Sequence, residues 1–158
     1  MNALVLVLAA AIQSEPLERL GKNAEGCEEF KNPKDGSILV LIPEGTFLRG
    51  EKKEEARLDG YLISKYEVTN EQFDRFLKET GRPAHVYKEH PDLFSGARQP
   101  VSFTTPELAE AYAAWAGGRI PAGEEWEKAA RGIDGRSFPW GEDNVPKGAK
   151  VPVPLWDD

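Results

Sequence analysis

Residues 111–141 read AYAAWAGGRIPAGEEWEKAARGIDGRSFPWG, which combines aromatic, charged and turn-forming residues more densely than the rest of the chain. It brings Trp115, Trp126 and Trp140 close in sequence to several Arg and Glu residues, with glycine or proline at nearly every turn. Large aromatic side chains interleaved with charges and turn formers predict one specific three-dimensional arrangement.

Two helices are predicted in and just before this stretch. One spans about residues 106–116, with Thr105 as its N-cap and Pro106 in its first position. The other spans about residues 124–131 and ends at Gly132, and its apolar face is expected to contain Trp126, Ala129 and Ala130. Because neither helix can bury its apolar stripe alone, both are expected to cover a common sheet, which predicts an α+β domain.

A further helix is predicted at about residues 70–80. Thr69 followed by Gln72 three residues later forms a capping box, and Gly81 and Pro83 end the helix. Its apolar stripe consists of Phe73, Phe76 and Leu77.

The strand signals lie earlier in the chain. Residues 38–42 and 46–48 are short aliphatic runs around the turn Pro43–Gly45, which predicts a hairpin. Residues 58–68 read as one extended stretch, and residues 100–103 as a short strand or extended lead-in.

The two ends of the chain are treated as separate segments. Residues 1–14 contain a continuous apolar run with Ala9 and Ala11 at an A-x-A spacing, which favours a signal peptide and export to the periplasm or outside the cell. The residues before the run contain no Lys or Arg, whereas the n-region of a signal peptide usually does. The alternative is an apolar strand or helix of a cytoplasmic protein. Residues 15–37 are interpreted as a polar leader or linker, and residues 142–158 as a short irregular tail.

Composition excludes some classes of function. The chain has 158 residues, enough for one domain, and 20 Lys and Arg against 27 Asp and Glu give a net charge of −7. An acidic protein without a basic patch is not expected to bind nucleic acid. No segment is long and apolar enough to be a transmembrane helix.

Ordinary catalytic and metal-binding motifs are absent from the sequence. Cys27 is the only cysteine, which rules out an internal disulfide or a cysteine-rich zinc site. His85 and His90 lack the spacing of a helical metal site and are interpreted as loop residues. The glutamates at 124, 125 and 127 lie in the first turn of a predicted helix, where acidic side chains are stabilised for structural reasons.

A series of short motifs carries a family resemblance. In order they are IPEGTF at 42–47, SKYEVTNEQF at 64–73, PVSF at 100–103, GRIP at 118–121, EWE at 125–127, AARG at 129–132 and PWG at 139–141. In this order and spacing the chain resembles the formylglycine-generating enzyme, or sulfatase-modifying factor, family over residues 38–141.

The resemblance implies a fold and an activity. It implies a C-type-lectin-like α+β fold, often in secreted proteins. Full enzymes of the family oxidise a cysteine of a sulfatase to formylglycine with molecular oxygen and a copper ion held by two cysteines. The resemblance also allows calcium, and it implies a protein or peptide partner such as a sulfatase.

The resemblance covers only the first part of the family domain. The copper-binding cysteines of the family lie beyond the PWG motif, and Cys27 alone cannot form a Cu(I) site of two thiolates. We therefore expect a truncated, non-catalytic binding or scaffold module, and predict no cofactor for this chain. One alternative is the N-terminal fragment of an oxidase completed by a C-terminal half, and another is a lectin-like binder of glycans or proteins.

The motif residues are expected to be structural, and no catalytic residue is assigned. Arg119 and Glu125 are expected to form a buried ion pair. The motif residues are Glu67, Asn70, Trp115, Arg119, Pro121, Glu125, Trp126, Arg131, Trp140 and Gly141.

Overall fold

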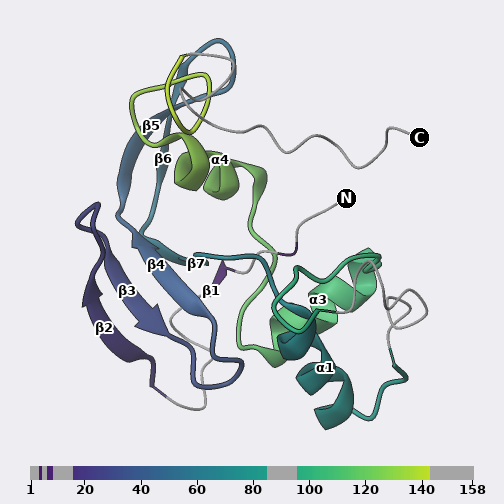
Figure 1. Cartoon of the computed structure of the whole chain (residues 1–158). Coiled ribbons are helices and arrows are strands. Elements are labelled where there is room, and N and C mark those ends of the chain that lie inside the picture. Colours follow the sequence, from purple (N-terminus) through teal and green to yellow (C-terminus); the bar gives the residue numbers. More distant parts are fainter. Residues whose placement is uncertain (1–3, 5–6, 9–15, 85–95, 143–158) are drawn as a thin grey trace. The chain divides into compact units, whose positions relative to one another are not determined.

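The computed structural model describes residues 4, 7–8, 16–84 and 96–142 (Figure 1). The chain forms two compact units, each with strands and helices. The first unit consists of residues 1–44 and 59–122, and the second of residues 45–58 and 123–158. The mixture of sheet and helix confirms the predicted α+β class.

The first unit contains a five-stranded sheet in which every neighbouring pair is antiparallel. In spatial order the strands are β1 (Val7–Leu8), β7 (Tyr61–Ser64), β4 (Ile38–Ile42), β3 (Glu28–Lys31) and β2 (Glu18–Lys22). In the central pair, Leu39 lies opposite Ser64 and Val40 opposite Ile63. Leu39 and Ile63 are buried, so β4 and β7 anchor the sheet to its core.

The predicted hairpin between residues 38–42 and 46–48 is wrong. Both strands form, but β4 pairs with β3 and β7, while β5 (Gly45–Arg49) pairs with β6 (Glu54–Leu58) in a separate two-stranded sheet. Since both edges of β4 are already occupied, it has no free hydrogen-bonding edge to offer β5.

The predicted extended stretch at residues 58–68 is divided. β6 ends at Leu58, and β7 begins at Tyr61 after Asp59 and Gly60. The stretch is therefore not one strand: the chain leaves the second unit after Leu58 and continues in the first unit from Asp59.

Residues 15–37 are not a linker, because they include β2 and β3. Asn23 makes the connecting turn: its side-chain oxygen accepts hydrogen bonds from the amides of Glu25 (3.1 Å) and Cys27 (2.9 Å). Across the hairpin, the Arg19 guanidinium donates two hydrogen bonds of 2.8 Å to the Glu28 carboxylate. These strands are mostly exposed or half-buried, so they lack the apolar alternation by which a strand is recognised in a sequence.

The described residues of the N-terminal apolar run belong to the first unit. Leu4 and Val7 are both buried. Val7 exchanges two main-chain hydrogen bonds of 2.8 Å with Arg119, and the Val68 amide donates to the Leu4 carbonyl at 2.9 Å. β1 therefore lies between β7 and the chain at Arg119.

The helices predicted at residues 70–80 and 106–116 are confirmed with their caps. α1 (Asn70–Glu79) has the Thr69–Gln72 capping box, and Gly81 adopts a positive φ of 66° just beyond its end. α3 (Pro106–Trp115) begins at the Thr105 cap. Among the described residues, no helix has the length and apolar character that a membrane span needs.

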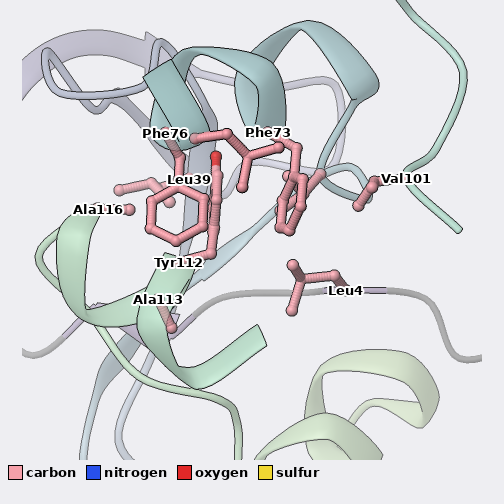
Figure 2. Close-up of a cluster of buried hydrophobic side chains, with 10 residues drawn as sticks. Leu4, Leu39, Phe73, Phe76, Val101, Tyr112, Ala113 and Ala116 are labelled. Carbon is pink, nitrogen blue, oxygen red and sulfur yellow. The ribbon is translucent and has the colours of Figure 1, made fainter. Parts of the chain in front are cut away.

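The core of the first unit lies where α1 and α3 meet the sheet. Figure 2 shows Phe73, Phe76 and Tyr112 pointing toward one another, with Leu39 and Leu4 beside them. The rings of Phe73 and Tyr112 are nearly parallel, with their centroids 5.5 Å apart. The rings of Phe76 and Tyr112 meet edge to face, also with centroids 5.5 Å apart. Such aromatic pairs add about 0.5–1.5 kcal/mol each beyond the burial of their area.

The second unit contains α4 (Gly123–Arg131), which packs on β5. The prediction that the helices at 106–116 and 124–131 cover a common sheet is wrong, because α3 and α4 lie in different units. The predicted inner face is also wrong: the buried residues of α4 are Glu125 and Lys128, while Trp126 is exposed. Lys128 is retained there by a hydrogen bond from its ammonium to the Gly45 carbonyl (3.1 Å).

Gly135 offers a test of packing within the second unit. Its φ is +69°, and an added Cβ would lie 2.9 Å from the Leu48 Cβ. We expect Gly135→Ala to lower the free energy of unfolding by about 2 kcal/mol, from backbone strain and overpacking together. Gly26→Ala is the matched control, because Gly26 has a φ of +82° but no atom within 4 Å of the added Cβ. Equal losses in urea unfolding would show that the Leu48 contact is not tight.

Candidate binding pocket

A pocket of about 520 Å³ opens in the first unit beside the start of α1. The segment before β4, the end of β7 and the residues after it, α1 and residues 98–100 all contribute to its wall. The lining residues are Gly36, Ser37, Ile38, Ser64, Tyr66, Glu67, Val68, Thr69, Gln72, Arg98 and Pro100.

Residues 96–100 are held against the start of α1 by main-chain hydrogen bonds. The Asn70 amide donates to the Gln99 carbonyl and the Glu71 amide to the Ala97 carbonyl, both at 2.9 Å. The Asn70 side chain adds a hydrogen bond of 3.0 Å to the Gly96 carbonyl. Since these contacts and the Thr69 cap already engage the first amides of α1, the pocket does not rely on a helix N-terminus for selectivity.

The exposed residues of the pocket wall include an aromatic ring and charges of both signs. Tyr66 is 63% exposed, and the Lys65 ammonium lies 5.6 Å from the centre of its ring. Glu67 and Arg98 are also exposed, and within the described residues neither charge is engaged in an ion pair. The wall can therefore receive an apolar group and a charged group at once.

Lys65 is fixed by an ion pair with Glu29, 2.8 Å away. The hydrogen bond to Glu29 raises the pKa of Lys65, and the same bond lowers the pKa of Glu29. Lys65 is therefore a permanent cation beside the Tyr66 ring.

A buried network of hydrogen bonds around Asp35 holds two residues of the pocket wall in place. The Asp35 carboxylate accepts hydrogen bonds from the Tyr112 hydroxyl (2.8 Å), the Ser37 hydroxyl (2.7 Å) and the Ser37 amide (2.9 Å). The Gln72 side chain donates to the Asp35 carbonyl at 3.3 Å. Burial, and then the neighbouring Asp35 charge, raise the pKa of Tyr112 above its ordinary value, so its hydroxyl stays a donor. Asp35 thus positions Ser37 and Gln72 in the pocket wall.

The structure brings only part of the predicted motif set to this pocket. Glu67 lines it, and Asn70 is buried at the start of α1. Trp115 is half-buried on α3, and its indole N–H donates to Glu79 at 3.1 Å. Arg119 is exposed and its main chain pairs with Val7, while Pro121 is half-buried.

The remaining motif residues belong to the second unit. Arg131 forms an ion pair with Glu127, and its guanidinium donates to the Arg136 carbonyl at 2.6 Å. Gly141 exchanges two main-chain hydrogen bonds of 2.9 Å with Phe138, and the ring of Trp140 stacks on Phe138 at 5.5 Å. These contacts hold the turns after α4.

The predicted Arg119–Glu125 ion pair involves one residue from each unit. Glu125 is buried, but Arg119 is exposed, so the expectation that both partners are buried is wrong. The pairing itself stays a prediction.

Of the residues that line the pocket, the sequence reasoning assigned only Glu67 to the motif set; it missed Ser37, Tyr66 and Arg98 among others, and also Asp35, which supports the wall. Tyr66 adjoins the EVTN motif, and an exposed aromatic beside a motif glutamate is a signal that could have found it. Arg98 carries no such signal, because it reaches the pocket only through the hydrogen bonds of residues 96–99.

Metal ligation has no candidate in the described part of the chain, where no group of three or more His, Cys, Asp or Glu residues could hold an ion. Cys27 is half-buried in the turn between β2 and β3. His85 and His90 lie outside the described residues.

Glu79, at the end of α1, joins α1 to α3 and to the loop before β4. It accepts hydrogen bonds from Lys34 (2.7 Å), Arg75 (3.1 Å) and Trp115 (3.1 Å). The hydrogen bond from Lys34, followed by that from Arg75, lowers the pKa of Glu79 from 4.5 to about 2.

This lowered pKa predicts a pH dependence of stability. A carboxyl group whose pKa is depressed in the folded state contributes stability above its unfolded pKa, and that contribution is lost as the pH falls from 4.5 to about 2. We expect the free energy of unfolding of Glu79→Gln to change less across this range than that of the wild type. Urea titrations at several acidic pH values measure it, and parallel curves would contradict the assignment.

Comparisons with known proteins give consistent results. A family model described as "Sulfatase-modifying factor enzyme 1-like domain" matches residues 26–158. The chain is 30% identical over 164 residues to a formylglycine-generating enzyme of Thermomonospora curvata, and 41% identical over 170 residues to one of Streptomyces coelicolor. These alignments cover 70% and 73% of this chain but 54% of each relative.

A mammalian relative gives the same proportion. The formylglycine-generating enzyme of Mus musculus is 26% identical over 180 residues, which cover 80% of this chain and 48% of the relative. The chain therefore spans about half the length of these curated relatives.

Proposed function

Because the chain belongs to the sulfatase-modifying factor enzyme 1-like family, we propose that it is a polypeptide-binding module of that family which is not catalytic by itself. The observation that carries the binding proposal is the pocket, whose wall combines the exposed Tyr66 ring with the charged side chains of Glu67 and Arg98, while the Lys65 ammonium lies 5.6 Å from the ring centre.

The chemistry of the pocket favours a polypeptide segment as the ligand. Ile38, Val68 and Pro100 offer apolar surface for a side chain, and Ser37 and Gln72 offer hydrogen-bonding groups for a main chain. Ligand sites commonly combine a mostly apolar wall with a few polar groups that orient the ligand. Several relatives carry the name formylglycine-generating enzyme, which favours a cysteine-containing segment of a sulfatase as the partner.

The thiol content supports the non-catalytic part of the proposal. The reaction of full family enzymes uses copper bound by two cysteines. This chain has one cysteine, in the β2–β3 turn, and a single thiol does not fit a Cu(I) site of two thiolates. No step of that reaction is therefore assigned to this chain.

A fluorescently labelled sulfatase peptide containing the target cysteine tests the binding proposal. We expect saturable binding by anisotropy, weakened about tenfold or more by Tyr66→Ala and by Arg98→Glu. Lys78→Glu, an exposed cation on α1 that does not line the pocket, is the control and should change the affinity less than about twofold. Binding that Tyr66→Ala and Arg98→Glu leave unchanged would remove the pocket from the proposal.

Mass spectrometry of the same peptide tests the catalytic part. With Cu(I) and oxygen present, the fraction of cysteine converted to formylglycine should equal that of a protein-free control. Conversion above the control would overturn the proposal that this chain is not catalytic by itself.

A second candidate function is favoured by the length comparison. The alignments cover about half of each formylglycine-generating relative, which supports a chain that works with the remaining half of the domain. In this case the C-type-lectin-like fold implied by the resemblance is complete only in the assembled protein. Sequencing the DNA beyond the codon for Asp158 in all frames would show whether a cysteine-bearing continuation exists.

For the N-terminal run, the packing supports a retained strand over a cleaved signal peptide. Cleavage after the A-x-A site would remove Leu4 and Val7 from the core of the first unit. The intact mass of the mature protein decides between the two: a mass that includes residues 1–14 supports the strand, and a shortened mass supports export.

A further inference from the structure

A tight turn at residues 96–99 carries Arg98 to the wall of the pocket. The Gly96 amide donates to the Gln99 side chain at 2.8 Å, and the Gln99 amide donates to the Gly96 carbonyl at 2.9 Å. Three further hydrogen bonds tie this turn to the start of α1. The main chain that carries Arg98 is therefore fixed, while its side chain is exposed at the pocket.

Within the part of the chain that the structure describes, Arg98 has no acidic partner. In this it differs from other cations of the first unit, such as Lys34 and Arg75, which lie 2.7 Å and 3.1 Å from the carboxylate of Glu79. A guanidinium is a planar fork of N–H donors that matches the two oxygens of a carboxylate. A ligand in the pocket can therefore supply the partner that Arg98 lacks.

Antiparallel pairing beside the pocket explains why Arg98 and Glu67 do not neutralise each other. Thr69 and Pro100 form an antiparallel bridge. Glu67 precedes Thr69 by two residues, and Arg98 precedes Pro100 by two residues. Because the two segments run in opposite directions, these positions lie on opposite sides of the bridge. The pocket wall thus has a cationic end at Arg98 and an anionic end at Glu67.

We infer that the pocket binds its polypeptide in one direction, with an acidic side chain of the ligand paired to Arg98. The carboxylate of Glu67 repels the same acidic side chain at the other end of the wall, which disfavours the reverse orientation. The inference rests on the proposed function and adds to it the charge that the bound segment carries and the direction in which it lies.

The charge of the whole chain works against acidic ligands. The net charge of −7 repels them at long range, although salt screens this repulsion beyond about 8 Å at physiological ionic strength. A preference for an acidic residue at one position of a ligand therefore has to come from a local cation in the pocket.

The test uses the whole chain and the labelled sulfatase peptide described above. Each residue of the peptide except the target cysteine is replaced, one at a time, by Glu, Gln or Lys, and anisotropy gives the dissociation constant of every peptide. We expect one position at which the Glu peptide binds about fivefold or more tightly than the Gln peptide, and the Lys peptide more weakly than both.

Two charge-reversal variants assign this preference to the wall. Arg98→Glu should reverse the order at that position, so that the Lys peptide binds most tightly. Glu67→Lys should create a second position, apart from the first, at which Glu is preferred. Lys78→Glu is the control and should leave both the position and the size of the preference unchanged. A reversal of preference is a gain of binding for one peptide, which damage to the fold does not produce.

The outcomes separate this inference from the proposed function. If peptides bind without a charge preference at any position, or with one that Arg98→Glu leaves intact, the pairing with Arg98 is wrong while polypeptide binding stands. If Glu67→Lys adds no second position, the direction is wrong. If no peptide of the series binds the wild type, the proposed function fails and this inference fails with it.

Discussion

Phe73→Ala is expected to lower the free energy of unfolding by about 3–5 kcal/mol, the usual loss when a large aromatic residue is removed from a core. Phe73 is fully buried, at 0% exposure, and its ring contacts those of Phe76 at 5.4 Å and Tyr112 at 5.5 Å. The substitution removes both ring contacts and leaves a cavity between α1 and α3. Because small domains are stable by only about 5–15 kcal/mol, this loss is a large fraction of the total.

Urea unfolding followed by circular dichroism measures this loss, and Phe103→Ala is the control. Phe103 is 55% exposed, so its replacement is expected to change the stability by less than about 1 kcal/mol. A similar loss for both variants would mean that the aromatic cluster of Figure 2 is not the centre of the folded core.

Asp35→Ala is expected to lower the free energy of unfolding by about 3 kcal/mol or more. It removes the acceptor of the Tyr112 hydroxyl, the Ser37 hydroxyl and the Ser37 amide. Each buried donor left without an acceptor costs about 1–3 kcal/mol. The same variant should weaken peptide binding, because Asp35 positions Ser37 in the pocket wall.

Tyr112→Phe separates the hydrogen bond from the packing of the ring. It retains the aromatic contacts and removes only the donor to Asp35, so the expected loss is about 1.5–3 kcal/mol. Tyr66→Phe removes a hydroxyl from an exposed ring and is expected to change the stability by less than about 0.5 kcal/mol. A Tyr112→Phe protein as stable as the wild type would show that Asp35 is satisfied without this bond.

The helices were predictable because their signals are local. The Thr69–Gln72 capping box and Gly81 define α1, and Thr105 with Pro106 begins α3. Every one of these signals acts within one helical turn of the residue that it caps. The family resemblance is likewise carried by short motifs in order, and the matching family model confirms it.

The strand pairings were not predictable in the same way. Residues 38–42 and 45–49 form two strands that follow each other along the chain, but they do not pair with each other. The partners of β4 are β3 and β7. β2 and β3 were missed because hydrogen bonds at Asn23 and the Arg19–Glu28 ion pair hold them, and neither produces an apolar pattern. Pairing is a competition between all strand edges, which no single segment reveals.

The buried face of α4 and the pocket, like the strand pairings, could not be predicted from local signals. The ends of the helices, the α+β class and the family could be predicted, because they depend on residues that are neighbours along the chain. The burial of Lys128, the exposure of Trp126 and the meeting of Arg98, Tyr66 and Glu67 at one pocket are visible only in the folded chain. They depend on contacts between residues far apart in the sequence, such as Asp35 with Tyr112 and Lys128 with Gly45.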